Sequence, residues 1–224
     1  MNLNFITSLS SQQNPKVAFN MVLLNYKLPS WWQNTLKYAT QIIVADGGAE
    51  QFKHTTLQLQ DKTIIMGDFD SISEQTSLNL QQRGYKFIST PDQDHTDCEK
   101  AVNMLPNTLP ILVLGALGGR FDHSLYNISI CARQFTLNKR IFMVDADNIL
   151  FVCKGVNLIQ TGPHNTVGLF PLKGKTKVLT KGLKWDVDGE IDFMGLVSVS
   201  NKAVNDQFTV ESEEEIGVVV TGSW

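Results

Sequence analysis

Residues 63–71 read TIIMGDFDS, a short apolar run that ends directly in two aspartates, Asp68 and Asp70. An apolar run of this length is typical of a strand that is buried on both faces of a sheet. Carboxylates at the end of a buried strand are costly to desolvate unless other groups compensate their charge. The rest of the chain should therefore supply those groups.

The same pattern recurs through the first two thirds of the chain. Apolar runs lie at 17–24, 41–46, 63–68, 85–89, 111–116 and 140–145. Helix-like segments separate them, with apolar side chains at helical spacing: Cys98, Ala101, Val102 and Leu105, then Phe121, Leu125, Ile128, Ala132 and Phe135. This alternation predicts an α/β domain with a mostly parallel sheet over residues 1–146.

The helical spacing ends after about Asn148. Short strand-like runs such as NTVGLFPL and IGVVVTG then follow one another between Gly, Asn and Asp residues. They predict an all-β sandwich domain over residues 147–224. Because so small a β unit buries little surface alone, we expect it to lean on the first domain or on a second subunit.

Composition narrows the class of protein. The 224 residues are 42% hydrophobic and 18% charged, as in ordinary globular proteins, and the net charge of -3 predicts no nucleic-acid partner. No apolar run is long enough for a membrane span, and residues 1–16 lack the basic start and apolar core of a signal peptide. Three separated cysteines, Cys98, Cys131 and Cys153, predict reduced core residues and a cytoplasmic location.

Four polar clusters follow predicted strands of the first half. They are ADGGA (45–49), GDFDS (67–71), DQDHTD (92–97) and GALGGRFDH (115–123). In open α/β sheets ligands bind beyond the carboxyl ends of the strands, so these clusters should meet at one edge. Ser71-x-x-Glu74 and Thr96-x-x-Glu99 fit helix capping boxes. Caps, however, do not require so many aspartates to converge.

The acidic edge predicts a site for Mg²⁺ and a nucleotide. Crowded carboxylates repel one another unless a cation lies among them, and hard oxygen ligands favour Mg²⁺. The glycine turn before Arg120 offers backbone N–H groups and a guanidinium to phosphate oxygens. Gly174-Lys175-Thr176 lacks the upstream glycine spacing of a P-loop, and no dinucleotide fingerprint is present.

Taken together, these motifs resemble those of the thiamine pyrophosphokinase family, and GLKW (182–185) and SVSN (198–201) extend the resemblance into the second half. The resemblance implies transfer of the terminal pyrophosphoryl group of ATP to the hydroxyl of thiamine, which gives thiamine diphosphate and AMP. It also implies an N-terminal α/β nucleotide domain, a C-terminal β-sandwich and a homodimer.

The resemblance further implies roles for particular residues. Mg²⁺ would be held by Asp68 and Asp70, and the other acidic catalytic residues would be Asp46, Asp97 and Asp122. ATP, the co-substrate, would contact Thr96, Gly118, Gly119, Arg120 and His123. Thiamine would contact Gln93 from the α/β side, and Trp185, Ser198, Ser200 and Asn201 from the partner subunit. The active sites would then be shared between the two subunits.

Two positions depart from the family pattern. Glu50 follows ADGGA where Asn or a basic residue is expected, and Asp186 follows Trp185. An extra acid near a polyphosphate would weaken ATP binding or shift the nucleotide preference.

Three alternatives stay open. A related pyrophosphokinase acting on a pterin or another hydroxymethyl heterocycle would not need Trp185 and SVSN. A Mg²⁺-dependent phosphohydrolase would release phosphate without thiamine. A nucleotide or thiamine sensor would need fewer carboxylates to bind a cationic ring.

Overall fold

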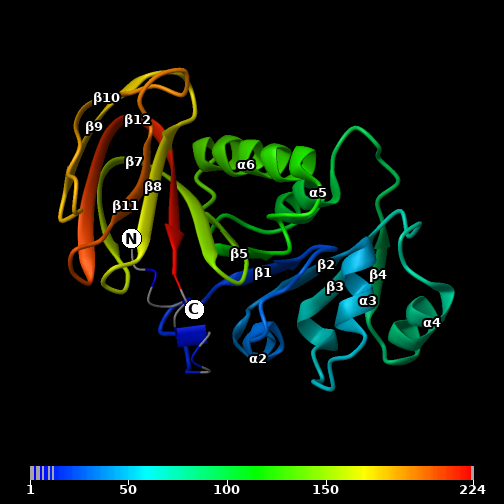
Figure 1. Cartoon of the computed structure of the whole chain (residues 1–224). Helices are drawn as coiled ribbons and strands as arrows, with labels where there is room; N and C mark the ends of the chain where they lie inside the picture. Colours follow the sequence, from blue (N-terminus) through cyan, green and yellow to red (C-terminus); the bar gives the residue numbers. More distant parts are fainter. Residues whose placement is uncertain (1–2, 4–5, 7, 10, 12, 223–224) are drawn as a thin grey trace.

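The computed structural model describes Leu3, Ile6, Ser8, Leu9, Ser11 and residues 13–222. Part of the opening segment, in which we expect no signal peptide, lies outside these described residues. The described residues form a twelve-stranded mixed sheet with helices on both faces of its parallel part (Figure 1).

The first half of the chain builds the parallel part. Its strands lie in the order β6-β5-β1-β2-β3-β4, and every neighbouring pair is parallel. The strands are β1 (Asn20–Leu23), β2 (Ile42–Ala45), β3 (Thr63–Gly67), β4 (Lys86–Ser89), β5 (Ile111–Leu114) and β6 (Ile141–Val144). The helical segments between them are α2 (Trp32–Thr35), η1 (Leu36–Tyr38), η2 (Asp46–Gly48), α3 (Ala49–Phe52), η3 (Gln60–Lys62), α4 (Glu74–Gln82), α5 (Asp97–Asn103) and α6 (Phe121–Thr136).

Burial of both sheet faces explains the unbroken apolar runs. In β1, Met21 and Leu23 pack in the core on the side of α2 and α3, whereas Val22 packs in the core on the side of α5 and α6. β1, β2, β5 and β6 are buried along their whole length. β4 differs, because it is the edge strand and both of its end residues are exposed. The expectation that residues 85–89 form a fully buried strand is therefore wrong.

The buried face of α6 also differs from the predicted stripe. Phe121 is 74% exposed and Leu125 is 52% exposed, while the helix buries Ser124, Asn127, Ile130, Cys131 and Gln134. Two of these polar side chains bind the backbone of the loop after β5. The Ser124 hydroxyl accepts from the Gly118 N–H (3.0 Å), and the Asn127 amide donates to the Ala116 carbonyl (2.8 Å). Ile128, Ala132 and Phe135 of the predicted stripe do pack against the core, so the stripe is wrong only at Phe121 and Leu125, in the part of the helix where hydrogen bonds to the loop turn Ser124 and Asn127 inward.

One of the two predicted helix caps is correct. The Thr96 hydroxyl accepts from the Glu99 N–H (3.4 Å) and begins α5. α4 begins two residues later than the Ser71 box implies, because its N-cap is Ser73, whose hydroxyl accepts from the Thr76 N–H (3.3 Å).

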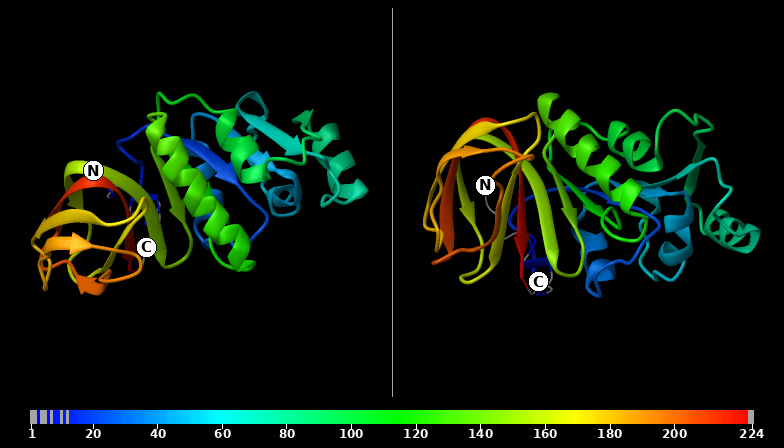
Figure 2. Two further views of the ribbon diagram at one scale, coloured as in Figure 1. Left: turned by 90° about the horizontal axis from the view of Figure 1, so that it is seen from above. Right: turned by 45° about the horizontal axis from the view of Figure 1, so that its top comes forward.

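The second half continues the same sheet with antiparallel strands. They are β7 (Asn148–Gln160), β8 (Thr166–Pro171), β9 (Thr176–Lys181), β10 (Asp188–Ile191), β11 (Ser198–Lys202) and β12 (Gln207–Thr221). The long strand β12 pairs with β7, β8 and β9. These strands curl round on themselves at one end of the molecule, away from most of the helices (Figure 2).

The predicted boundary at 146/147 falls in a tight turn between two paired strands. β6 and β7 are antiparallel neighbours, with Phe142 opposite Phe151. The rings of these two residues lie 5.7 Å apart within a hydrophobic core that runs through both halves. The two halves therefore share backbone hydrogen bonds and a core.

Cys98, Cys131 and Cys153 are buried and unpaired, as expected. Within the described part of the chain, no helix combines the length and the apolar character that a membrane span needs.

Because the core is shared, replacing Phe151 by Ala should destabilise the whole chain. Phe151 is 1% exposed, so its loss should lower the free energy of unfolding by about 3–5 kcal/mol. Urea denaturation should show one shifted transition for both halves. Val156→Ala, on the same strand at a side chain that is 74% exposed, should change stability by less than about 0.5 kcal/mol. Two separate transitions would contradict the coupling.

Candidate active site

A cleft of about 1180 Å³ opens at the carboxyl edge of the parallel strands. The loops after β1 to β5 line it, as expected for an open α/β sheet. The site residues predicted in the first half all line this cleft: Asp46, Asp68, Asp70, Gln93, Thr96, Asp97, Gly118, Gly119, Arg120, Asp122 and His123. Trp185, Ser198, Ser200 and Asn201 lie in the strand-rich half and do not line it.

Asp46 is the carboxylate that carries the cost of burial. It is 3% exposed, whereas Asp70 is exposed and Asp68 is half-buried. The Ser71 N–H donates to Oδ2 of Asp46 (3.3 Å), but the buried Oδ1 of Asp46 has no hydrogen-bond partner. Burial, together with the charges of Asp97 and Asp68, raises the pKa of Asp46 to about 6, against the lowering effect of the Ser71 N–H. The sequence suggests a desolvation cost for Asp68 and Asp70 of the GDFDS motif, but in the structure the most strongly desolvated carboxylate is that of Asp46.

Asp46, Asp68 and Asp70 are close enough to hold one metal ion. One carboxylate oxygen from each lies within 4.8 Å of the others. Three carboxylate oxygens at the strand ends are a hard ligand set that suits Mg²⁺, and the unpartnered Asp46 Oδ1 is available to it. The Gln93 amide donates to Asp68 Oδ2 (2.8 Å) and thereby lowers the pKa of Asp68. The chain itself therefore keeps Asp68 ionised.

The opposite wall of the cleft is a glycine turn held by Tyr26. Gly118 and Gly119 have φ values of +88° and +67°, in the left-handed region. A Cβ at either position would lie within 2.7 Å of the Tyr26 ring, so only glycine allows this contact. Arg120 follows at the start of α6 and forms a salt bridge with Asp122, which lowers the pKa of Asp122. A phosphate bound here would compete with Asp122 for the guanidinium.

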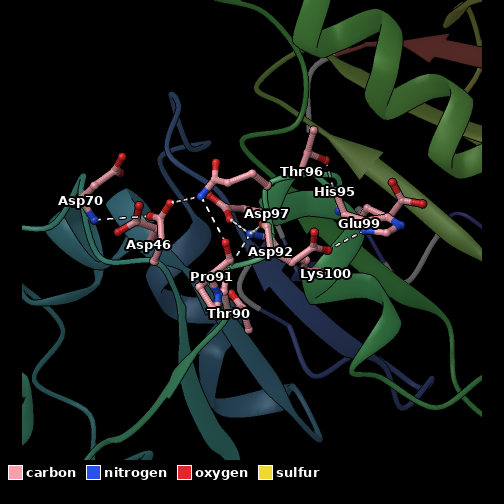
Figure 3. Close-up of polar contacts among 12 residues, drawn as sticks. Asp46, Asp70, Thr90, Pro91, Asp92, His95, Thr96, Asp97, Glu99 and Lys100 are labelled. Atoms are coloured by element: carbon pink, nitrogen blue, oxygen red, sulfur yellow. Dashed lines mark hydrogen bonds and ion pairs between the residues drawn. The ribbon is translucent and has the colours of Figure 1, made fainter.

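Lys100 organises the acidic loop between β4 and α5 (Figure 3). Its ammonium donates to the carbonyls of Thr90 (3.1 Å) and Asp92 (2.9 Å) and lies 3.2 Å from an Asp97 oxygen. The Lys100 side chain is only 11% exposed. It therefore positions Asp97 while offsetting some of the negative charge of the cleft.

The sequence reasoning missed two cleft residues of the loop after β1. Asn25 packs against Gly47, and Tyr26 packs against the glycine turn. A signal was present, because the first strand of a parallel sheet ends at the same edge as its neighbours. The polar clusters predicted from the sequence follow only the second to fifth strands.

In the strand-rich half, Asn201 fixes the backbone of Trp185. Its amide donates to the Trp185 carbonyl (2.6 Å) and accepts from the Trp185 N–H (3.1 Å). Asn201 is 3% exposed, whereas Trp185 is 57% exposed and the Lys184 ammonium lies 4.4 Å from the centre of its ring. Asp186, one of the departures from the family pattern, accepts hydrogen bonds from the backbone N–H groups of Gly182 and Leu183 and so shapes the turn before Trp185.

Two family models match the chain. The model described as "Thiamin pyrophosphokinase, catalytic domain" matches residues 32–143, and that described as "Thiamin pyrophosphokinase, vitamin B1 binding domain" matches residues 156–216. Thiamine pyrophosphokinase 1 of Arabidopsis thaliana is 31% identical, over 88% of this chain and 84% of that protein. Thiamine pyrophosphokinase of Saccharomyces cerevisiae is 33% identical, over 82% of this chain and 75% of that protein.

Solved structures share the fold. Thiamin pyrophosphokinase from Candida albicans superposes with a TM-score of 0.82 at 24% identity, over 92% of this chain and 89% of that one. The yeast thiamin pyrophosphokinase structure gives a TM-score of 0.80 at 22% identity, over 99% of this chain and 90% of that one.

An acid-rich cleft at the strand ends of an α/β sheet, facing a glycine turn and an arginine, is typical of enzymes that transfer phosphoryl groups. The chain belongs to the thiamin pyrophosphokinase family, which confirms the resemblance seen in its motifs. It is therefore a diphosphotransferase, and the known reaction of its family is transfer of pyrophosphate from ATP to thiamine. This family membership displaces the pterin, phosphohydrolase and sensor alternatives.

The raised pKa of Asp46 predicts a pH-dependent stability difference. Between about pH 4 and pH 6 the folded protein keeps a proton on Asp46 that the unfolded chain releases, so this carboxyl destabilises the fold increasingly up to pH 6 and fully above it. In EDTA, Asp46→Asn should therefore melt at a higher temperature than wild type near pH 7.5, and the gap should shrink near pH 4.5. Thermal denaturation at both pH values checks this. An equal difference in melting temperature at both pH values would contradict the raised pKa of Asp46.

Proposed function

We propose that the cleft binds ATP with Mg²⁺ and that the terminal pyrophosphoryl group of ATP is transferred in this cleft to the hydroxyl of thiamine. The observation that supports this most directly is the convergence of Asp46, Asp68 and Asp70 opposite the Gly118–Arg120 turn. The volume of the cleft, about 1180 Å³, is ample for a nucleoside triphosphate.

In this proposal each wall of the cleft has its own task. Asp68 and Asp70, with Asp46, hold Mg²⁺, which neutralises charge on the phosphates when it is bound. The Gly118 and Gly119 N–H groups and Arg120 take phosphate oxygens, and Thr96 and His123 complete the ATP site. Asp97, held by Lys100, and Asp122, held by Arg120, orient the substrates.

The chemical step follows from the reaction. The thiamine hydroxyl oxygen attacks the β-phosphorus of ATP, the bond between that phosphorus and the oxygen bridging to the α-phosphate breaks, and AMP leaves with the electron pair. One of the cleft carboxylates accepts the hydroxyl proton. Neutralised phosphates and fixed N–H donors lower the barrier because they match the charge of the transition state.

Thiamine is proposed to bind between two subunits. The ring is aromatic and cationic, so an acidic cleft and an aromatic face suit it. Trp185 does not line the cleft of its own chain, and Asn201 fixes its backbone. This favours a contribution of Trp185 to the cleft of a partner subunit. Ser198 and Ser200 would contact thiamine from the same side as Trp185, and Gln93 would contact it from the acidic side. Phe193, Met194, Leu196 and Val199 are all more than half exposed, as expected of a surface that a second subunit covers.

The cytoplasm is the compartment that we propose for this homodimer. Its three buried cysteines are unpaired, and a reducing compartment keeps thiols in that state.

The first test is the reaction itself. Purified protein with Mg²⁺, ATP and thiamine should yield AMP and thiamine diphosphate in equal amounts, separated by chromatography. Asp70→Asn should lower kcat by about 10²–10³-fold, because it removes a charge that acts on the reacting phosphates. Asp61→Asn, an exposed acid at the opposite end of β3, should leave kcat unchanged. ADP with thiamine monophosphate would mean that the wrong phosphorus is attacked.

The shared site can be tested by mixing two inactive variants. Trp185→Ala and Asp70→Asn chains, unfolded together and refolded, should regain about a quarter of wild-type activity, since half of the dimers are mixed and each mixed dimer has one intact site. Each variant refolded alone serves as the control. If the mixture stays inactive, Trp185 serves its own chain.

A further inference from the structure

Glu50, the acid that departs from the family pattern, points away from the cleft. It lies in the first turn of α3, directly after the segment that carries Asp46, but it is not among the residues that line the cleft. Its carboxylate forms an ion pair with Lys53 (2.6 Å) and is about one third exposed. The expectation that it weakens ATP binding by repulsion is therefore not supported by its placement.

The partners of Glu50 lie at the start of α4. Its Oε1 accepts from the Ser73 N–H (2.7 Å), and its Oε2 accepts from the Thr76 hydroxyl (2.9 Å). Ser73 is the N-cap of α4, and Thr76 is the residue three positions later, which is 2% exposed. In a capping box the third helical residue itself binds the N-cap N–H through a Glu or Gln side chain. Here Glu50 supplies that carboxylate from another helix, 23 positions away along the chain.

The same segment of chain carries the metal-binding aspartates. The Asp68–Ser73 turn begins at the end of β3 and ends at the N-cap of α4. Within it, Phe69 has a left-handed φ of +66°, and the Ser71 N–H reaches Asp46 over 3.3 Å. Its first end is fixed by the strand, and its second end is fixed to α3 by Glu50. The negative charge of Glu50 also lies favourably at the N-terminus of α4.

We propose that Glu50 is a positioning residue for the metal site: by tying Ser73 and Thr76 to α3, it holds the Asp68–Ser73 turn where Asp68 and Asp70 meet Asp46. The inference rests on the proposed function in that it takes these aspartates as the metal ligands. Burial works against the charge of Glu50, but Lys53, Ser73 and Thr76 lower its pKa to about 2, so the tie is present at every working pH.

The test uses Glu50→Gln, which keeps the shape but weakens the bonds to Thr76 and Lys53. Binding of Mn²⁺ to the nucleotide-free protein, followed by the electron-spin resonance of free Mn²⁺, should be about tenfold weaker than in wild type. Half-maximal activity should need about tenfold more Mg²⁺, while kcat at saturating Mg²⁺ stays within about twofold. Hydrogen exchange of amides 69–76 in the metal-free variant should be faster than in wild type. A loss of folding alone would instead lower activity at every Mg²⁺ concentration.

Two further variants sharpen the test. Glu74→Gln removes an exposed acid from the first turn of the same helix without touching the tie, so it should match wild type in Mn²⁺ affinity and exchange. Thr76→Val removes the hydroxyl that donates to Glu50 and that accepts from Lys53 and Ser73, but it keeps the bond from the Ser73 N–H to Glu50. It should shift both readouts in the same direction as Glu50→Gln.

The outcomes separate this inference from the proposed function. Wild-type Mn²⁺ affinity and unchanged exchange in both Glu50→Gln and Thr76→Val would overturn the role of Glu50. A wild-type protein that binds no Mn²⁺ would refute the metal site, and hydrogen exchange of residues 69–76 alone would then decide whether Glu50 holds the turn.

Discussion

The burial of the Asp46 carboxylate at the edge of the parallel sheet is the constraint on which the rest of the site depends. Parallel strands end together, so the loops after β1 to β5 all reach this edge, and among its aspartates Asp46 is buried there. A charge in such a place needs compensation. Asp97 forms an ion pair with Lys100, and Asp122 forms one with Arg120. In the described part of the chain, no side chain forms an ion pair with the other three aspartates, Asp46, Asp68 and Asp70. The compensation that the chain does not provide is what a divalent cation would supply.

The two walls of the cleft are held by contacts between loops rather than by regular structure. Tyr26 fills the space beside Gly118 and Gly119, and the side chain of Gln51 donates to the Tyr26 carbonyl (2.7 Å), which ties this loop to α3. α3 therefore touches both sides of the site, the glycine turn through Tyr26 and the aspartate turn through Glu50. A short helix of four residues thereby links the proposed phosphate and metal sites.

Much of the fold and of the acidic site could be predicted from the sequence. Consecutive apolar residues identified the strands, because strands buried on both faces leave no polar positions, and the aspartates after them could then be assigned to one edge. The errors arose where a polar contact or an edge position overrode the apolar pattern. α6 turns Ser124 and Asn127 inward because both bind the loop after β5, and β4 is exposed because no strand follows it at the edge. The sequence pattern predicts the glycine turn but not the packing of Tyr26 against it, which requires glycine there.

By itself the sequence determined the α/β strands, the order of the acidic and glycine motifs, and through them the family and its reaction. Those features are carried by residues that are neighbours along the chain. Tertiary structure alone decided that Asp46 is the buried carboxylate, that β6 and β7 join the two halves in one sheet, and that Glu50 binds α4 instead of facing the cleft. The environments of Asp46 and Glu50 depend on contacts with residues more than twenty positions away, and the joining of β6 to β7 depends on backbone pairing across a turn. A local pattern of residues does not contain that information.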